Sequence, residues 1–310
     1  MVQRHIVRLD PIDGDPHRDP LTVSYLEWRP EAPAGETVVL LHGGGFDSAS
    51  LSWSEVGPRL AAAGHRVIAP DHPGYGLSPL PRWPSTQQNV LGYLDRFLPA
   101  VAGDHYVLGG LSMGGALTLG SVLRRPEHVR GIMLLASGGL MTRQRPGRFS
   151  LPIHLVTWLS VRSGLMRAAF DWSGRSRRFT QGSMSNLIRN PSVQTDELID
   201  EILATAHAAP AVAFTQWQRD QILPTRIRDD YTAQLGAIQC PALVVHGDRD
   251  PGVLADHGRT AAAALPDGEL LMVPGAAHWV QRDRPDIVVP AMINFLDRLD
   301  GGDDATAADS

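Results

Sequence analysis

The sequence predicts an α/β fold, in which helices cover a largely parallel sheet, on three observations. Short runs of β-branched and apolar residues alternate with helical patterns, as they do in the βα units that build parallel sheets. The chain has 310 residues, of which 43% are apolar, so it can bury a large core. The alternation stops in mid-chain and later resumes, which indicates a helical segment inserted into the core domain.

The first part of the chain supplies the strands and helices predicted before this interruption. Each predicted strand is a short apolar run that ends at or near a Gly or Ser. One predicted helix closes on Gly64, because Gly commonly follows the last turn of a helix. The predicted strands are 36–43, 65–74, 105–110 and 129–137, and the predicted helices are 53–64, 87–101 and 115–125.

Residues 139–235 interrupt the alternation. They are rich in Arg and Trp, they contain helical patterns such as 195–206, and they show no convincing strand. We therefore predict a core domain formed by 1–138 and 236–300, with 139–235 as a helical insertion. We expect a disordered tail over 301–310. The alternation resumes with 241–250 and 268–278, each predicted as a strand followed by a loop, and with predicted helices 255–265 and 284–299.

Composition excludes several classes of function. All 28 basic residues are Arg, so the chain has no Lys for a phosphate-binding loop, a Schiff base or a Ser-Lys catalytic pair. The single Cys240 excludes an internal disulfide and a Cys-rich zinc site. The net charge is −5 with both signs interspersed, so we expect no nucleic acid and no membrane as a partner. The charged stretch 1–19 does not resemble a signal peptide, which predicts a cytoplasmic protein.

The uncharged run 106–123 allows two interpretations. It has the length of a short membrane-spanning helix, but it contains five glycines, which destabilise helices. The sequence GLSMG at 110–114 instead matches G-x-S-x-G, a tight turn that presents a nucleophilic Ser. The match lies between a predicted strand and a predicted helix, as that turn requires. We therefore predict that Ser112 is the catalytic nucleophile.

A nucleophilic Ser also needs a base and a carboxylate that orients the base. After this turn they follow in the order Asp or Glu, then His. Only His257 and His278 follow both Ser112 and a loop Asp at a strand end. His257 lies in a predicted helix, whereas His278 lies in a loop at the carboxyl edge of the sheet, so we predict His278 as the base. Asp248 and Asp250 both remain candidates for the carboxylate.

Four separated motifs agree in order and spacing with those of one protein family. Through them the sequence resembles the α/β-hydrolase superfamily over nearly the whole chain, in the branch that uses a Ser nucleophile. The resemblance implies a mostly parallel sheet of the eight-stranded type with helices on both faces, and it implies that 139–235 is a cap, or lid. The motifs are HGGG at 42–45, DHPGYGLS at 71–78, GLSMGG at 110–115, and HGDRDP at 246–251 with GAAHW at 275–279.

The resemblance implies roles for further residues. The backbone N–H groups of Gly44 and Met113 would form the oxyanion hole, and Gly45 and Trp279 would contribute to the substrate site. The family's carboxylate usually lies three positions after the Gly of the HG pair, which selects Asp250. The chain departs from the family pattern in one place, because GAAH replaces the commoner GxGH before the His.

We expect a serine hydrolase that cleaves a carboxylic ester, lactone or thioester of a small to medium apolar substrate through an acyl-enzyme on Ser112. No metal and no organic cofactor are expected. Two alternatives stay open. One is a hydrolase of carbon-carbon bonds in ring-fission diketones, which HGGG and HWVQ at 278–281 also resemble. The other is a non-hydrolytic protein on the same scaffold, such as a receptor or an eliminating or cyclising enzyme.

The cap sequence suggests both a partner and a pocket. Arginine clusters at 143–148 and 174–178 could contact an acidic carrier domain, and a homodimer also stays open. Most large cap side chains should pack against the cap's own helices, as large apolar residues usually do. A few should form an apolar roof that faces Ser112. These large residues are Trp158, Met166, Phe170, Trp172, Met184 and Trp217.

Overall fold

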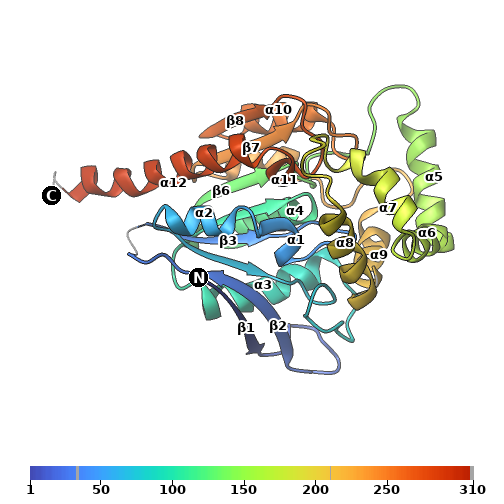
Figure 1. The fold of residues 1–310 in the computed structure, drawn as a ribbon, viewed down its shortest axis with the longest axis horizontal. Coiled ribbons are helices and arrows are strands. Elements are labelled where there is room, and N and C mark those ends of the chain that lie inside the picture. The colour runs from blue at the N-terminus through green and yellow to red at the C-terminus, as the bar shows by residue number, and fades with distance from the viewer. Residues whose placement is uncertain (33–34, 210, 308–310) are drawn as a thin grey trace.

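The computed structural model describes residues 1–32, 35–209 and 211–307, with side chains up to residue 300. An eight-stranded sheet lies at its centre, with helices on both faces (Figure 1). The strand order is β1-β2-β4-β3-β5-β6-β7-β8, and all pairings from β4 to β8 are parallel. The strands are β1 Val2–Leu9, β2 Leu21–Trp28, β3 Thr37–Leu41, β4 Arg66–Pro70, β5 Tyr106–Leu111, β6 Val129–Leu135, β7 Ala242–Gly247 and β8 Gly268–Val273.

The central strands are apolar along their whole length because helices cover both of their faces. Every residue of β5 and β7 is buried, and β3, β4 and β6 each have one partly exposed residue. Continuous apolar runs of this kind are typical of parallel strands. These strands and β8 are the ones that the sequence predicts. The predicted α/β fold with a mostly parallel sheet is confirmed.

The sequence analysis missed β1 and β2, which extend the sheet as an antiparallel pair. Their register runs from Val2 opposite Trp28 to Leu9 opposite Leu21, and β2 also pairs antiparallel with β4. β1 is an edge strand, and most of its residues are exposed. An exposed edge strand needs no clean alternation of apolar and polar residues, because neither face must be apolar. This explains why β1 gave no signal. β2 is mostly buried, but the buried polar residues Ser24 and Glu27 interrupt its apolar run.

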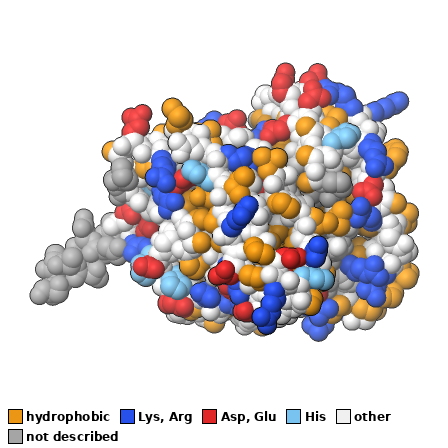
Figure 2. All heavy atoms as spheres, turned by 90° about the horizontal axis from the view of Figure 1, so that it is seen from below, with side chains coloured by type: hydrophobic (Ala, Val, Ile, Leu, Met, Phe, Trp, Pro, Cys, Tyr) orange, Lys and Arg blue, Asp and Glu red, His pale blue; other side chains and the backbone are white. Residues whose placement is uncertain are grey.

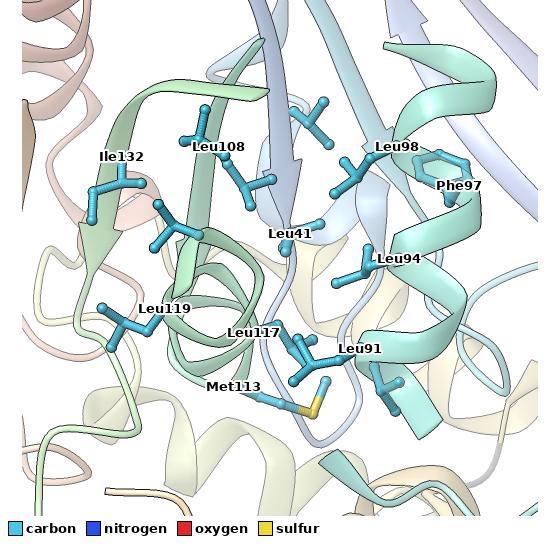
Figure 3. Close-up of a cluster of buried hydrophobic side chains, with 14 of the residues drawn as sticks. Leu41, Leu91, Leu94, Phe97, Leu98, Leu108, Met113, Leu117, Leu119 and Ile132 are labelled. Atoms are coloured by element: carbon cyan, nitrogen blue, oxygen red, sulfur yellow. The ribbon is translucent and has the colours of Figure 1, made fainter. Parts of the chain in front are cut away.

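Helices form one apolar layer on each face of the sheet. Figure 3 shows part of one layer, where Leu91 and Leu94 of α3 and Leu117 of α4 gather beside Leu41 of β3. Burying one such side chain contributes about 1.5–3 kcal/mol, so these contacts hold the helices on the sheet. One face carries α3 Gln87–Val101, α4 Met113–Arg124 and α10 Ala255–Ala264; the other carries α1 Ala49–Trp53, α2 Gly57–Ala62, α11 Val280–Asp283 and α12 Pro285–Ala307.

The last helix, α12, corrects one expectation. It extends over 301–307, where the sequence predicts a disordered tail. Val288, Met292 and Phe295 pack its first turns against the sheet. Adding residues to a helix that packing already holds requires no new nucleus, which favours this extension. The rest of the predicted tail, 308–310, lies outside the described residues.

Residues 139–235, for which we keep the name cap, lie beyond the carboxyl ends of the parallel strands, at the right of Figure 1. Gly164 has a φ of 84° and separates two of the helices, because the left-handed conformation ends a helix. The helices are α5 Ser150–Ser163, α6 Leu165–Ser173, α7 Arg177–Ser183, η2 Met184–Asn186, α8 Asp196–Ala208, α9 Val212–Gln221 and η3 Thr232–Ala237; a further short turn, η1 Pro126–His128, precedes β6.

The uncharged run 106–123 forms β5, a turn and most of α4, as the second of the two interpretations predicts. Within the described ranges, no helix combines the length and the apolar character that crossing a membrane requires.

Candidate active site

Ser112 lies at the sharp turn between β5 and α4. Its φ of 53° and ψ of −110° are unusual for a residue with a side chain. The flanking glycines make this turn possible. A Cβ on Gly110 would lie 2.2 Å from the carbonyl carbon of Gly114, and a Cβ on Gly114 would lie 2.2 Å from the carbonyl oxygen of Leu41. The G-x-S-x-G pattern therefore reflects the close approach of β5, α4 and β3.

The backbone around Ser112 is fixed by hydrogen bonds, whereas the first turn of α4 leaves N–H groups free. The N–H of Ser112 donates to the oxygen of Leu135 at 3.0 Å, and the oxygen of Ser112 accepts from Gly138 at 2.8 Å. No described residue accepts from the N–H of Met113. The Met113 side chain is buried among apolar residues of the core (Figure 3). The Tyr75 hydroxyl donates to its sulfur at 3.5 Å.

His278 and Asp250 meet at the carboxyl edge of β7 and β8. Nδ1 of His278 donates to Oδ2 of Asp250 at 2.8 Å, so Nε2 is left to accept a proton. The other oxygen of Asp250 accepts from the N–H groups of Gly252 at 2.7 Å and Val253 at 3.1 Å. Gly247 allows the two loops to touch, since a Cβ there would lie 2.4 Å from two carbonyl oxygens of the His278 loop.

The structure separates the two candidate carboxylates. His278 bonds to Asp250 and not to Asp248, whose Oδ1 accepts from the N–H of Gly275 at 2.7 Å. Asp248 thus fixes the turn that leads toward His278. His257 lies on α10, as expected, and not in a loop at the sheet edge.

Asp250 has a second histidine neighbour that the sequence analysis did not single out. Nε2 of His246 donates to the oxygen of Val253 at 2.9 Å and lies 3.4 Å from Oδ2 of Asp250. Burial raises the pKa of Asp250, but the hydrogen bonds with His246 and His278 outweigh it and hold that pKa below its usual range. Asp250 is therefore ionised at neutral pH and can stabilise a protonated His278.

The HGGG loop is held by a buried carboxylate. Asp47, which is 1% exposed, accepts from the N–H of Gly43 at 2.7 Å and from the Ser52 hydroxyl at 2.8 Å. Burial raises the pKa of Asp47. No described residue accepts from the N–H of the next residue, Gly44. The sequence analysis missed Asp47, although it directly follows HGGGF in the chain.

The second motif, DHPGYGLS, supports the same edge of the sheet. Oxygens of Asp71 accept from Arg4 of β1 at 2.7 Å, from the N–H of Ala49 at 2.9 Å and from the N–H of Leu77 at 3.1 Å. Asp71 therefore joins the edge strand to two loops. His72 is buried, and this burial holds its pKa well below 6.5.

A cavity of about 370 Å³ lies between the core and the cap, a volume typical of small-molecule sites. The predicted residues Gly44, Gly45, Ser112, His278 and Trp279 all line it. Its walls are mainly apolar, with a few hydroxyl and amide groups from the cap. The other lining residues are Gly43, Phe46, Phe170, Ser173, Phe179, Thr180, Ser183, Met184, Asn186, Leu187, Ile202 and Phe214.

Aromatic side chains form the roof over the HGGG loop. The ring of Phe214 lies so close to Gly44 that a Cβ there would approach it to 2.1 Å. Phe170 meets Phe214 edge to face at 5.4 Å between ring centroids. Phe170 and Met184 belong to the six large cap residues of which a few were expected to face Ser112, and both line the cavity. Trp172, another of the six, is 59% exposed.

Two contacts tie the cap to the His278 loop. The N–H of Trp279 donates to the oxygen of Leu187 at 2.8 Å. Asp283, which is fully buried, accepts from the N–H groups of Arg189 at 2.9 Å, Asn190 at 2.7 Å and Ala277 at 2.7 Å. One carboxylate thus connects the turn before α8 to the residue that precedes His278.

One group of side chains among the described residues has the spacing of a metal site, but it lies far from Ser112 in the chain and does not line the cavity. It consists of His65, Asp297 and Asp300. Nδ1 of His65 accepts from the N–H of Glu36 at 3.1 Å, so the neutral ring carries its proton on Nε2, the nitrogen that faces the carboxylates. A metal would have to displace that proton. Burial lowers the pKa of His65, which favours the neutral ring over an ion pair with the carboxylates.

Known proteins resemble this chain in sequence and structure. A model of the alpha/beta hydrolase family matches residues 38–291. A 2-hydroxy-6-oxo-6-phenylhexa-2,4-dienoate hydrolase from Burkholderia cepacia is 30% identical over 280 residues, which cover 86% of this chain and 89% of that protein. The solved structure of a serine hydrolase involved in carbazole degradation is similar with a TM-score of 0.70 and 25% identity, covering 94% of this chain and 99% of the other.

The fold extends to more distant proteins. The structure of a thermophilic esterase from Thermogutta terrifontis matches with a TM-score of 0.69 at 20% identity, covering 95% of this chain and 99% of the esterase. The family match spans most of the chain and includes all four motifs. It confirms the resemblance that these motifs carry. The chain belongs to the alpha/beta hydrolase family and is a hydrolase.

Proposed function

We propose that the protein is a serine hydrolase that cleaves an ester-type bond in an uncharged, largely apolar substrate. Ser112 is the nucleophile, His278 is the base and Asp250 orients it. The backbone N–H groups of Gly44 and Met113 stabilise the oxyanion. The contact between His278 and Asp250 supports this assignment, as does the position of Ser112 in the same cavity.

The chemistry then follows in two steps. Nε2 of His278 takes the proton of Ser112 while the hydroxyl oxygen attacks the carbonyl carbon, and the protonated ring returns that proton to the leaving alcohol. Water, activated by the same His278, then releases the acid from Ser112. Each oxyanion donor lowers the barrier by about 3 kcal/mol. No hydrogen bond joins Ser112 to His278 in the structure, and such contacts often tighten only when substrate binds.

One observation carries the choice of an uncharged substrate: the cavity has no cation. Of the described residues that line it, none is Arg and His278 is the only one with a titratable side chain. Burying a carboxylate without a cationic partner costs several kcal/mol. An anionic substrate would therefore bind weakly, while the aromatic roof and the hydroxyls of Thr180 and Ser183 suit an apolar acyl group with one neutral polar site.

A second candidate is a carbon-carbon bond hydrolase. The relative from Burkholderia cepacia acts, by its name, on a dienoate, which is a carboxylate. Trp279, directly after His278, also lines the cavity, and the sequence motif around it resembles such enzymes. The missing cation counts against this candidate, since the dienoate would bring its charge into the cavity.

A substrate panel separates the two candidates. We expect kcat/KM for p-nitrophenyl esters to rise from acetate to hexanoate by roughly four-fold per buried methylene, because each contributes about 0.8 kcal/mol. We expect 2-hydroxy-6-oxo-6-phenylhexa-2,4-dienoate to react at least about ten-fold less efficiently than the best ester. Ser112→Ala is the control for both reactions. A dienoate that exceeds every ester in kcat/KM would replace our proposal with the second candidate.

A further inference from the structure

The outer surface of the cap exposes many large apolar side chains. Of the fourteen large hydrophobic residues that are exposed in the described chain, eight lie between residues 149 and 179. Monomeric proteins rarely gather exposed apolar residues in this way unless the surface contacts something. The eight are Phe149, Leu151, Ile153, Val156, Leu159, Leu165, Trp172 and Phe179.

The same surface is strongly basic, although the whole chain is acidic. Residues 140–190 contain nine Arg and a single acidic residue, Asp171, whereas the net charge of the chain is −5. Several of these arginines have no carboxylate partner within the described residues. Four of the unpaired arginines are also exposed, namely Arg148, Arg162, Arg175 and Arg178.

Apolar and basic residues share one face of α5. Val156, Leu159 and Arg162 follow one another at spacings of three residues, so each is a neighbour of the next on the surface of α5. Arg148 precedes the helix and lies over the ring of Phe149, 4.6 Å from its centroid. Figure 2 shows hydrophobic and basic side chains close together at the cap end of the molecule, on the right.

A shallow hollow on this surface lies next to the active-site cavity. Phe179, Ser183 and Asn186 line both, and the hollow is also lined by the exposed Trp172 and by Arg178. The basic apolar surface is thus separated from the cavity that Ser112 lines by a few side chains.

We propose that this surface, formed by α5, α6 and α7, binds anionic lipid bilayers. Interfacial helices combine Arg with Leu, Phe or Trp in this manner: the apolar side chains enter the boundary of the acyl chains while the arginines contact lipid headgroups. The even mixture of charges along the whole sequence predicts no membrane partner, but that average hides the local excess of Arg in residues 140–190.

Two other occupants fit the surface less well. A second copy of the chain would bring the unpaired arginines of both copies together, and like charges repel. An acidic carrier protein would pair with the arginines, but it would not explain why Val156 and Leu159 are exposed, because a charged surface offers them no apolar contacts.

Vesicle binding tests the proposal on the full chain. We expect the protein to sediment with vesicles of equal parts phosphatidylcholine and phosphatidylglycerol, but not with phosphatidylcholine alone, and to be released by about 0.5 M salt. The double variant Val156→Ser/Arg162→Glu should weaken binding at least about 30-fold, because it reverses a charge at the surface and removes apolar area. Neither residue lines the cavity, so the ester hydrolysis and the melting temperature of the double variant should match those of the wild type.

Matched variants make the result specific. Ile6→Ser/Arg8→Glu makes the equivalent changes, a β-branched aliphatic residue to Ser and an Arg to Glu, on the exposed edge strand β1. This variant should bind vesicles like wild type. Ser112→Ala should also bind like wild type, so vesicle binding is independent of the proposed hydrolysis. The proposal is overturned if anionic vesicles do not bind, if both double variants lose binding equally, or if polyglutamate binds and vesicles do not. It is also overturned if analytical ultracentrifugation shows that the only effect of Val156→Ser/Arg162→Glu is to convert a dimer to a monomer.

Discussion

At the carboxyl edge of the sheet, a Cβ added to Gly110, Gly114 or Gly247 would lie within 2.4 Å of backbone atoms, whereas in the cap a Cβ on Gly164 or Gly182 would meet nothing within 4 Å. The first three glycines let strands, helix and loops touch where the candidate catalytic residues lie. Gly164 and Gly182 lie at a helix end and within a helix that face open space, unlike Gly174, where a Cβ would lie 2.8 Å from the Phe46 ring. Glycine therefore allows close backbone contacts at the carboxyl edge of the sheet, whereas at these two cap positions no neighbouring atoms require it.

This contrast suggests a division of roles. Backbone contacts fix the positions of Ser112, Asp250 and His278, and backbone cannot shift without breaking strand or helix hydrogen bonds. Side chains of the cap, such as Phe170 and Phe214, shape the cavity and can change with little effect on the sheet. Changes at the sheet edge should therefore alter the rate or the stability strongly, and changes on the outer cap should alter neither.

The largest effect should come from Ser112→Ala. Removing the nucleophile should lower kcat by about 10⁶-fold, as it does in other serine hydrolases with a complete triad. A fluorophosphonate probe should add once to the wild type and not to the variant, as intact mass will show. Labelling that persists in the variant would assign the nucleophile to another residue.

The next effect separates the two neighbouring carboxylates. Asp250→Asn should lower kcat by about 10⁴-fold, because His278 would lose the partner that sets its tautomer. Asp248→Asn changes only a turn contact with Gly275 and should cost far less. Steady-state kinetics on one ester suffice for both. If Asp248→Asn proves the more damaging, the orienting role belongs to Asp248.

A pair of glycine substitutions tests the contrast itself. Gly114→Ala forces a Cβ against the oxygen of Leu41 and should destabilise the fold by about 1–3 kcal/mol. Gly182→Ala adds a Cβ into open space within α7 and should stabilise by about 0.5–1 kcal/mol, since Ala favours helix. Melting temperatures measure both. Equal losses at the two positions would remove the distinction between the regions.

The smallest effect concerns pH. The pKa of Asp250 is lower in the folded protein than the value of about 3.9 in an unfolded chain. Its ionised form therefore stabilises the fold above that pH, and the contribution is lost as the pH falls through the folded pKa. The melting temperature of wild type should exceed that of Asp250→Asn most at neutral pH, with a smaller excess near pH 3. An excess that stays constant between these conditions would contradict the assignment.

The sequence predicts the parallel part of the fold because buried strands leave a strong pattern. Strands such as β5 and β7 are wholly apolar, and their apolar runs are visible without a structure. The exposed β1 carries no such pattern. The exposure of Trp172 also escapes prediction, because an aromatic residue in a helix gives no sign of whether another helix covers it.

The candidate site shows the same limit. Ser112, Asp250 and His278 lie in short motifs with fixed spacing, so the sequence alone brings them together. Asp47 and His246 lie directly after or within the quoted motifs, but their contacts with the site depend on how the chain folds, which the motifs do not show. Such supporting residues become visible only when the distances are known.

Asp283 has a consequence for engineers who wish to exchange the cap. Its buried carboxylate belongs to the core sequence, but two of the three N–H groups that it accepts come from Arg189 and Asn190. A chimera that joins a foreign lid at residues 139 and 235 would leave this carboxylate short of donors unless the graft offers a matching turn. A foreign cap should therefore fit if its own backbone presents two adjacent N–H groups where those of Arg189 and Asn190 lie. Otherwise, Asp283 should be replaced by a smaller, neutral residue.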